Sequence, residues 1–434
     1  MQRRDFLRDM LSGATAAGLA GRALAGAASP IAARGGVERR QGQATNPVLV
    51  VIYLRGAQDA LNTIIPYADP RYYEIRPTIA ISPKSGAGEK GVVRLNKRWG
   101  LHPAMASLLP VWKAGKLAPI VCVGSPHPTR SHFDAQDFME YAAPGLRTSR
   151  DGWLNRYLAL TADRSGSDSP LRALAMQGLL PRSLRGKYPV LAVPERGGRR
   201  AARYLDLFDD LYMEPGAKQP AMASEGTRRE DPVVRTGHTT ITTLRRYQTI
   251  VGRAKKGKQH AVRYPRGRLG SRLGDIAKVI QAGEPLEVAC VDWNGWDHHT
   301  GEGGEDGRMA RMLSQVSDSI AAFLRDLGPA AERTVVVTMT EFGRTCRENG
   351  NMGTDHGHGG AMLLAGGPVA GGKVYGRFPG LRDRDMYQGR DLVVTTDFRD
   401  VMAELIVRHM GVKKLPKDFF PDFNPSRKPL GILG

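Results

Sequence analysis

Residues 334–360 read TVVVTMTEFGRTCRENGNMGTDHGHGG, and this stretch determines both the expected fold and the expected site. Its first six residues are rich in β-branched side chains, which predicts a strand. Glu341 follows that strand at the edge where open α/β sheets bind their ligands. Asp355, His356 and His358 then place a carboxylate and two imidazoles among glycines that allow tight backbone turns. We interpret the segment as a strand followed by metal ligands; the alternative is a glycine-rich surface turn.

Three other places repeat this pattern of a strand followed by polar side chains. The predicted strands are residues 47–54, 119–123 and 286–291, followed respectively by Asp59, by Ser131 with His132 and Asp134, and by Asp297 with His298 and His299. Because parallel strands end at a common edge, these side chains are expected to meet. Asp59 could instead cap a helix. Ser131 and Asp134 fit a capping box, which accounts for their spacing as well as a nucleophilic serine does.

Helical segments alternate with the strands, which predicts an α/β fold. The apolar run over residues 47–54 predicts a strand that is buried on both faces. Helices are expected over residues 103–113, 306–327 and 398–410. We divide the fold into a first part, residues 47–194, and a second part, residues 284–434. A basic, mainly helical insertion, residues 195–283, separates them.

The amino-terminal residues predict export. Arg3 and Arg4 form a twin-arginine signature, and we expect residues 1–29 to be a signal peptide and residues 30–46 a disordered tether. The expected partner is the twin-arginine export machinery, and the expected location is periplasmic or secreted. The mature chain has no apolar run of the length that a membrane span needs, so we expect it to carry no transmembrane anchor.

Positive charge is concentrated in one segment. The chain has 63 Lys and Arg against 43 Asp and Glu, and eleven of the basic residues lie between Arg235 and Arg272 without an acidic residue among them. Such a block can attract polyanions over long range. The alternative is a solvated insertion that keeps the protein soluble.

The candidate site residues suggest a metal ion and an anionic substrate. Carboxylate oxygens and imidazole nitrogens from several strands suit Zn²⁺, Mn²⁺ or Fe, and two such divalent ions could clamp a phosphoryl group or a related oxyanion. Ser131 is a candidate nucleophile. Arg130 or Arg344 could hold the oxyanion, because the guanidinium offers a planar fork of donors.

Six motifs together carry a family resemblance. They are L-R-G-x-x-D-x-L-N from Leu54, R-S-H-F-D-A-Q-D from Arg130, D-G-W-L-N-R from Asp151, W-D-x-H from Trp296, T-E-F-G-R-T from Thr340 and G-T-D-H-G-H-G-G from Gly353. In this order, behind a twin-arginine signal, they resemble the DUF1501 family of exported proteins of unknown function, which is similar to the alkaline phosphatase and sulfatase superfamily. The resemblance implies an alkaline-phosphatase-like three-layer sandwich with a mixed, mostly parallel sheet, and a site that binds two metal ions.

The resemblance also implies roles for individual residues. Ser131 takes the position of the nucleophile, and the implied metal ligands are Asp59, Asp297, His299, Glu341, Asp355, His356 and His358. The chain lacks the Cys-x-Pro-x-Arg motif of formylglycine sulfatases. We therefore expect an exported metal-dependent hydrolase or transferase that acts on a phosphate or sulfate ester. The alternative is a non-catalytic exported binding or assembly protein on the same scaffold, which could bind polyanions.

Overall fold

The computed structural model describes most of the chain from Asn46 onward. The described residues are 46–84, 90–164, 169–193, 232–253, 262–426 and 428–434. The predicted signal peptide, the predicted tether up to residue 45, and residues 195–231 and 254–261 of the predicted insertion lie outside the described residues.

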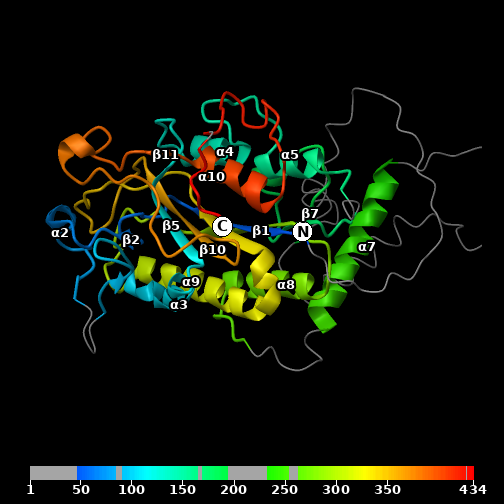
Figure 1. Ribbon diagram of the computed structural model, residues 1–434, viewed down its shortest axis with the longest axis horizontal. Helices are drawn as coiled ribbons and strands as arrows, with labels where there is room; N and C mark the ends of the chain where they lie inside the picture. The colour runs from blue at the N-terminus through cyan, green and yellow to red at the C-terminus, as the bar shows by residue number, and fades with distance from the viewer. Residues whose placement is uncertain (1–45, 85–89, 165–168, 194–231, 254–261, 427) are drawn as a thin grey trace, which may run out of the picture.

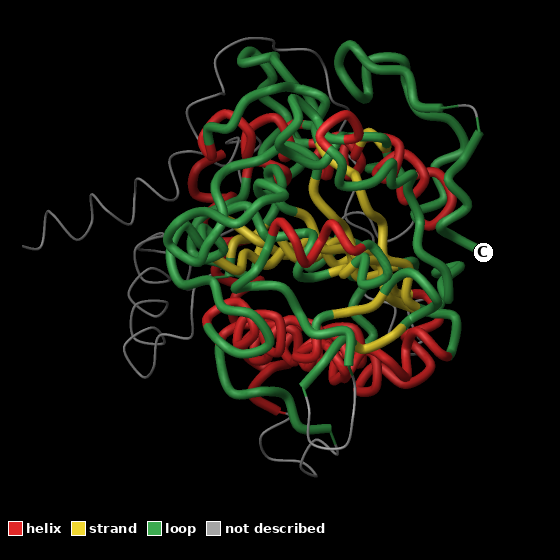
Figure 2. The backbone as a smooth tube through the Cα atoms, turned by 90° about the vertical axis from the view of Figure 1, so that its left-hand side faces the viewer, coloured by secondary structure: helices red, strands yellow, loops and turns green. Residues whose placement is uncertain are grey.

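An eight-stranded sheet forms the middle of the molecule (Figures 1 and 2). In sheet order the strands are β11 (Thr396–Asp397), β5 (Leu117–Gly124), β10 (Gly360–Gly366), β9 (Thr334–Met339), β1 (Val48–Arg55), β8 (Val288–Asn294), β6 (Ala173–Ala175) and β7 (Leu191–Ala192). Strand β10 runs antiparallel to both of its neighbours, and the other pairs are parallel. The predicted mixed, mostly parallel sheet is confirmed.

Strand β1 lies inside the sheet because its apolar side chains face both ways. Val48, Val50 and Ile52 belong to the hydrophobic cluster on one face, whereas Leu49 and Val51 belong to the cluster on the other. Successive side chains of a strand point to opposite faces, so a run of consecutive apolar residues can fill two cores at once. The strand predicted from this run is confirmed.

Helices cover both faces of the sheet and complete the predicted three-layer α/β fold (Figure 2). One layer contains η1 (Pro103–Leu108), α3 (Leu109–Lys113), α8 (Arg268–Gln281) and α9 (Arg308–Leu327), and the other contains α4 (His132–Tyr141), α5 (Trp153–Leu160), α10 (Phe398–Glu404) and η5 (Leu405–His409) (Figure 1). Helix α9 buries Met309, Leu313, Val316 and Ile320 against the sheet, at the spacing of one helical face.

Smaller elements complete the described fold. A three-stranded sheet is formed by β2 (Ile64–Ile65), β4 (Gly100–Leu101) and β3 (Val93–Arg94), and the short helices are α2 (Pro70–Ile75), η2 (Arg182–Leu184), η3 (Gly328–Arg333) and η4 (Asp383–Asp385). Within the predicted insertion, α7 (Pro232–Arg253) lies at one end of the molecule, and α8 packs into the helical layer beside α9 (Figure 1). Among the described residues, no helix is both long and apolar enough to cross a bilayer.

Candidate metal centre

The ends of several strands meet at one edge of the sheet. The parallel strands β1, β8 and β9 end nearly level, with Arg55 opposite Asn294 and Tyr53 opposite Met339. Strand β10 runs the other way, so the segment that precedes it, residues 353–359, enters at the same edge. Helix α4 begins there as well, at His132, after the end of β5. Side chains that lie far apart in the sequence are therefore brought together.

Glycines in residues 343–359 allow the loops at this edge to pack backbone against backbone. A Cβ atom on Gly343 would lie 1.8 Å from the carbonyl oxygen of Gly359, and one on Gly357 would lie 2.4 Å from the carbonyl carbon of Arg344. This packing lets Arg344 and His356 form an antiparallel bridge. None of the glycines in residues 343–360 has a positive φ. The sequence predicts that these glycines allow tight turns, whereas the structure uses them for close approach of the backbones.

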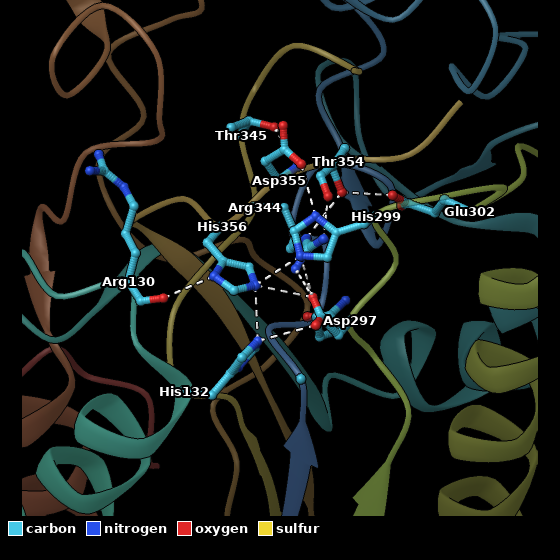
Figure 3. A network of polar contacts seen from close by, with 12 residues as sticks. Arg130, His132, Asp297, His299, Glu302, Arg344, Thr345, Thr354, Asp355 and His356 are labelled. Atoms are coloured by element: carbon cyan, nitrogen blue, oxygen red, sulfur yellow. Dashed lines mark hydrogen bonds and ion pairs between the residues drawn. The ribbon is translucent and has the colours of Figure 1, made fainter. Parts of the chain in front are cut away.

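Three imidazoles and one carboxylate converge at this edge (Figure 3). The Nε2 atom of His356 lies 2.9 Å from Nε2 of His132 and 3.0 Å from Nε2 of His299. The Asp297 carboxylate lies 3.2 Å from Nε2 of His356, 3.0 Å from Nε2 of His299 and 3.4 Å from Nε2 of His132. His132, Asp297 and His356 satisfy the geometric requirement for a metal-ligand cluster.

The other nitrogen of each imidazole has its own acceptor. Nδ1 of His132 lies 2.8 Å from Glu341 Oε1. Nδ1 of His299 lies 2.8 Å from Asp355 Oδ1, and Nδ1 of His356 lies 2.9 Å from the carbonyl oxygen of Arg130 (Figure 3). Because a carbonyl and an ionised carboxylate can only accept, each Nδ1 donates. In the neutral imidazoles, the proton then sits on Nδ1 and Nε2 presents a lone pair.

When all three imidazoles are neutral, four electron-rich atoms therefore face one another with no proton between them. Three Nε2 lone pairs and an anionic oxygen repel at these separations, and a cation among them would remove the repulsion. Histidine ligands to metals commonly donate their second nitrogen to a carboxylate or a backbone carbonyl, as all three imidazoles do here. The donor set thus fits a metal ion.

Charges around the cluster keep Asp297 ionised. The Arg344 guanidinium donates to Asp297 Oδ1 at 2.6 Å. Although burial acts in the opposite direction, this contact holds the pKa of Asp297 below its usual value. The hydrogen bond with Glu341 raises the pKa of His132 against the effect of burial. Burial, followed by the repulsion from His132, lowers the pKa of His356.

The cluster is open to solvent. The side chains of His132 and His356 are 23% and 24% exposed, and those of Asp297 and His299 are each 42% exposed. Structural zinc sites are closed, whereas catalytic sites keep a position for water or substrate. Nitrogen and oxygen donors in this mixture suit zinc or a neighbouring transition metal. The arrangement can therefore hold an ion that also contacts a ligand from solution.

Not all of the predicted ligands contribute to this cluster directly. Asp297, His299 and His356 face one another, while Glu341 and Asp355 lie behind His132 and His299 as hydrogen-bond partners. Glu341 is fully buried and also accepts hydrogen bonds from the Gly56 amide and the Gln136 side chain. The structure thus gives these two carboxylates an orienting position.

Two predicted ligands have other partners. Asp59 forms a buried ion pair with Arg76, which also donates to the backbone carbonyls of Thr345 and Cys346. The ion pair between Asp59 and Arg76 therefore links the loop after β1 to the loop after β9. The His358 ring stacks on Tyr387 at a centroid distance of 4.1 Å. Burial, followed by the charge of Arg130, lowers the pKa of His358 to about 4, which keeps this imidazole neutral at pH 7.

The predicted catalytic residues surround the cluster. Ser131 is the N-cap of α4, and its Oγ accepts from the Asp134 amide at 3.5 Å. The Arg130 carbonyl accepts from His356, while its guanidinium pairs with Asp391 at 2.7 Å and points away from the cluster (Figure 3). Arg344 directs its donors to Asp297 and to Thr354.

His132 was part of the predicted site, but the set of predicted metal ligands did not include it. The sequence does contain a feature that indicates His132 as a ligand, because His132 directly follows the helix cap Ser131 after a predicted strand. The first helical residue projects from the helix end, whereas the cap residue is turned back toward the backbone. Two buried residues near the site have no such feature in the sequence. They are Arg76, which pairs with Asp59, and Glu302, which accepts a hydrogen bond from Thr354.

The comparison with protein-family models agrees with the resemblance found in the sequence. Residues 273–419 match the family model described as "Protein of unknown function (DUF1501)", and the predicted resemblance is confirmed over that range. No curated protein matches the chain. Among solved structures, the chain is similar to the PsFucS1 sulfatase from Pseudoalteromonas sp., with 13% sequence identity, a TM-score of 0.36, and coverage of 90% of this chain and 73% of that one.

Proposed function

We propose that the protein is a metal-dependent hydrolase of phosphate or sulfate esters, with one metal ion held by His132, Asp297, His299 and His356. The convergence of three Nε2 atoms and one carboxylate is the observation that carries this proposal. The sequence and its family resemblance predict two ions. The residues that meet in the described part of the chain form the donor cluster around His132, Asp297 and His356, and our proposal concerns the ion that this cluster would hold.

Each group at the site has a distinct task in this proposal. A bound ion would supply a Lewis acid that polarises an ester oxygen and lowers the pKa of water. Glu341 and Asp355 hold the rings of His132 and His299 in place, and the carbonyl of Arg130 does the same for His356. Arg344 holds Asp297 ionised and fixes its direction. These contacts organise the ligands before substrate arrives, which is the main requirement for electrostatic catalysis.

Ser131 remains the nucleophile that the sequence predicts. Its position next to His132, at the partly exposed start of α4, supports this proposal. Water is the alternative nucleophile. Replacement of Ser131 by alanine separates the two, because turnover should disappear if Ser131 attacks and should persist if water does. Metal content must stay unchanged in this variant for the comparison to be valid.

The proposed activity is tested with para-nitrophenyl phosphate, bis(para-nitrophenyl) phosphate and para-nitrophenyl sulfate. We expect turnover of at least one of them by the metal-loaded protein, and loss of that turnover in the His356→Ala variant. His409→Gln is the matched control, because His409 contacts the Val48 carbonyl at the start of β1, the opposite edge of the sheet. A protein that binds metal at this cluster but hydrolyses none of the three would support the non-catalytic alternative.

Export and polyanion binding are proposals that rest on the sequence. The twin-arginine signature supports the first, and the basic residues from Arg235 to Arg272 support the second. Binding to heparin or DNA that weakens steeply with salt would support a polyanion site in this segment. Binding that is unaffected when the lysines at positions 255, 256 and 258 are replaced by glutamine would argue against it.

A further inference from the structure

A cavity of about 280 Å³ lies beside the metal centre. Its lining includes Ile75, Arg347, Asn349, Asp355, Met386 and Arg390. Asp355 connects the cavity to the cluster, because the same carboxylate accepts the hydrogen bond from His299. Arg390 forms a second connection, since its guanidinium donates to the backbone carbonyl of His356 at 2.8 Å. The cavity therefore adjoins the residues that hold two of the clustered imidazoles, His299 and His356.

The carboxylates in the cavity wall already have donors. Glu348 accepts from the backbone amides of Thr78 and Ile79 and from the Thr78 hydroxyl. Asp355 accepts from His299 and from the Asn349 side chain. Both carboxylates therefore already accept hydrogen bonds from groups of the protein.

The two arginines in the cavity wall, Arg347 and Arg390, have guanidinium N–H groups that are available to bind a ligand. Arg347 is exposed, and within the described part of the chain no ion pair or hydrogen bond engages its guanidinium. Arg390 is 41% exposed, and its ion pair with Asp391 is 3.6 Å long, because Arg130 occupies the same Asp391 oxygen at 2.7 Å. The groups in the cavity wall that can still form hydrogen bonds are therefore the positively charged guanidinium N–H donors of Arg347 and Arg390. Such donors favour the binding of an anion.

The volume of the cavity and the apolar residues in its wall also restrict the size and the chemistry of the ligand. Small-molecule pockets usually span roughly 300–1,000 Å³, so a cavity of this volume suits part of a small molecule. Ile75 and Met386 provide apolar surface for a short carbon chain. On the basis of the proposed function, we propose that this cavity is a subsite for a second anionic group of the substrate. The substrate class is a small phosphate or sulfate ester whose alcohol carries a carboxylate, phosphate or sulfate a few atoms from the ester.

Equilibrium binding tests this subsite without requiring turnover. The probes are carboxyalkyl phosphonates with chains of increasing length, compared with alkyl phosphonates of the same length, on the full metal-loaded chain. We expect at least one carboxylated probe to bind about tenfold more tightly than its alkyl counterpart, the size of effect that charge-assisted hydrogen bonds provide. Arg347→Gln should remove most of that preference, and Arg390→Gln should reduce it. Arg408→Gln is the matched control, since Arg408 is exposed and precedes His409 at the opposite edge of the sheet.

Equal affinity of both probe series overturns the subsite. A preference that survives both Arg347→Gln and Arg390→Gln overturns it as well, because chelation of the metal by the carboxylate would then explain the result. The hydrolysis assay gives an independent answer. Turnover without a preference refutes the subsite alone, and a preference without turnover supports the subsite while refuting the proposed hydrolase.

Discussion

Replacement of Glu341 by glutamine tests the proposed role of this buried carboxylate. Oε1 of Glu341 accepts from Nδ1 of His132 at 2.8 Å, from the Gly56 amide at 2.8 Å and from the Gln136 side chain at 3.0 Å. The glutamine carbonyl can occupy the same position and accept the same three hydrogen bonds. The substitution therefore removes the negative charge while keeping the shape and the Oε1 acceptor. It replaces Oε2, which lies 3.1 Å from the Thr340 hydroxyl, with an NH₂ group that can donate to that hydroxyl oxygen.

The expected loss follows from that change of charge. A hydrogen bond to a charged group contributes about 1.5–3 kcal/mol, and one between neutral groups contributes about 0.5–1.5 kcal/mol. The difference of about 1–2 kcal/mol corresponds to a metal Kd that is roughly five- to thirtyfold weaker. This range overlaps the ten- to hundredfold losses that are typical when the partner of a metal-bound histidine is changed.

The assay is a competition titration of the metal-free protein with Zn²⁺ and a chelator of known affinity, with circular dichroism to verify folding. Glu287→Gln is the matched control, because Glu287 is a buried carboxylate that pairs with Arg172 and Tyr157 just before β8 begins. We expect weaker binding for Glu341→Gln and unchanged binding for Glu287→Gln. Equal Kd values for Glu341→Gln and the wild type would refute the orienting role. A complete loss of binding would instead favour Glu341 as a direct ligand, as the sequence predicts.

Three substitutions elsewhere at the site test its packing and its charges. Gly343→Ala should lower the free energy of unfolding by about 1–3 kcal/mol in urea, because the new Cβ would meet the backbone of the neighbouring loop; Gly350→Ala, on the same loop but with open space around it, should have a small effect. Arg76→Met should cost about 3–5 kcal/mol, because it leaves the buried carboxylate of Asp59 unpaired, and a loss below about 1 kcal/mol would contradict that explanation. Ser131→Ala should cost about 1 kcal/mol through loss of the helix cap, measured by the same titration, and an unchanged midpoint would show that the cap contributes nothing.

Much of the fold could be predicted because its strands carry strong local signals. The apolar runs that became β1 and β9 need burial on both faces, and few arrangements other than a covered, mostly parallel sheet provide it. The same logic predicted that polar residues after separate strands would meet, and Asp297, His299 and His356 do meet. Parallel strands share an edge, so this part of the site follows from topology.

It was harder to predict which of the candidate residues join the metal cluster and which have other partners. His356 and His358 are separated by one residue in the segment that leads into β10, yet one joins the cluster and the other stacks on Tyr387. Which of them faces the metal centre depends on the bridge between His356 and Arg344. The partner of Asp59 depends in the same way on how the segment containing Arg76 packs. The direction of each side chain is determined by tertiary contacts, and no periodic pattern in the sequence indicates it.

Elemental analysis of the full chain, purified without a metal-affinity tag, tests the central claim most directly. We predict about one transition-metal ion per chain, its loss in His356→Ala, and its retention in the control His409→Gln, as expected for a site built on histidine nitrogens. A wild-type protein that takes up no metal, or a His356→Ala variant that keeps it, would contradict the account.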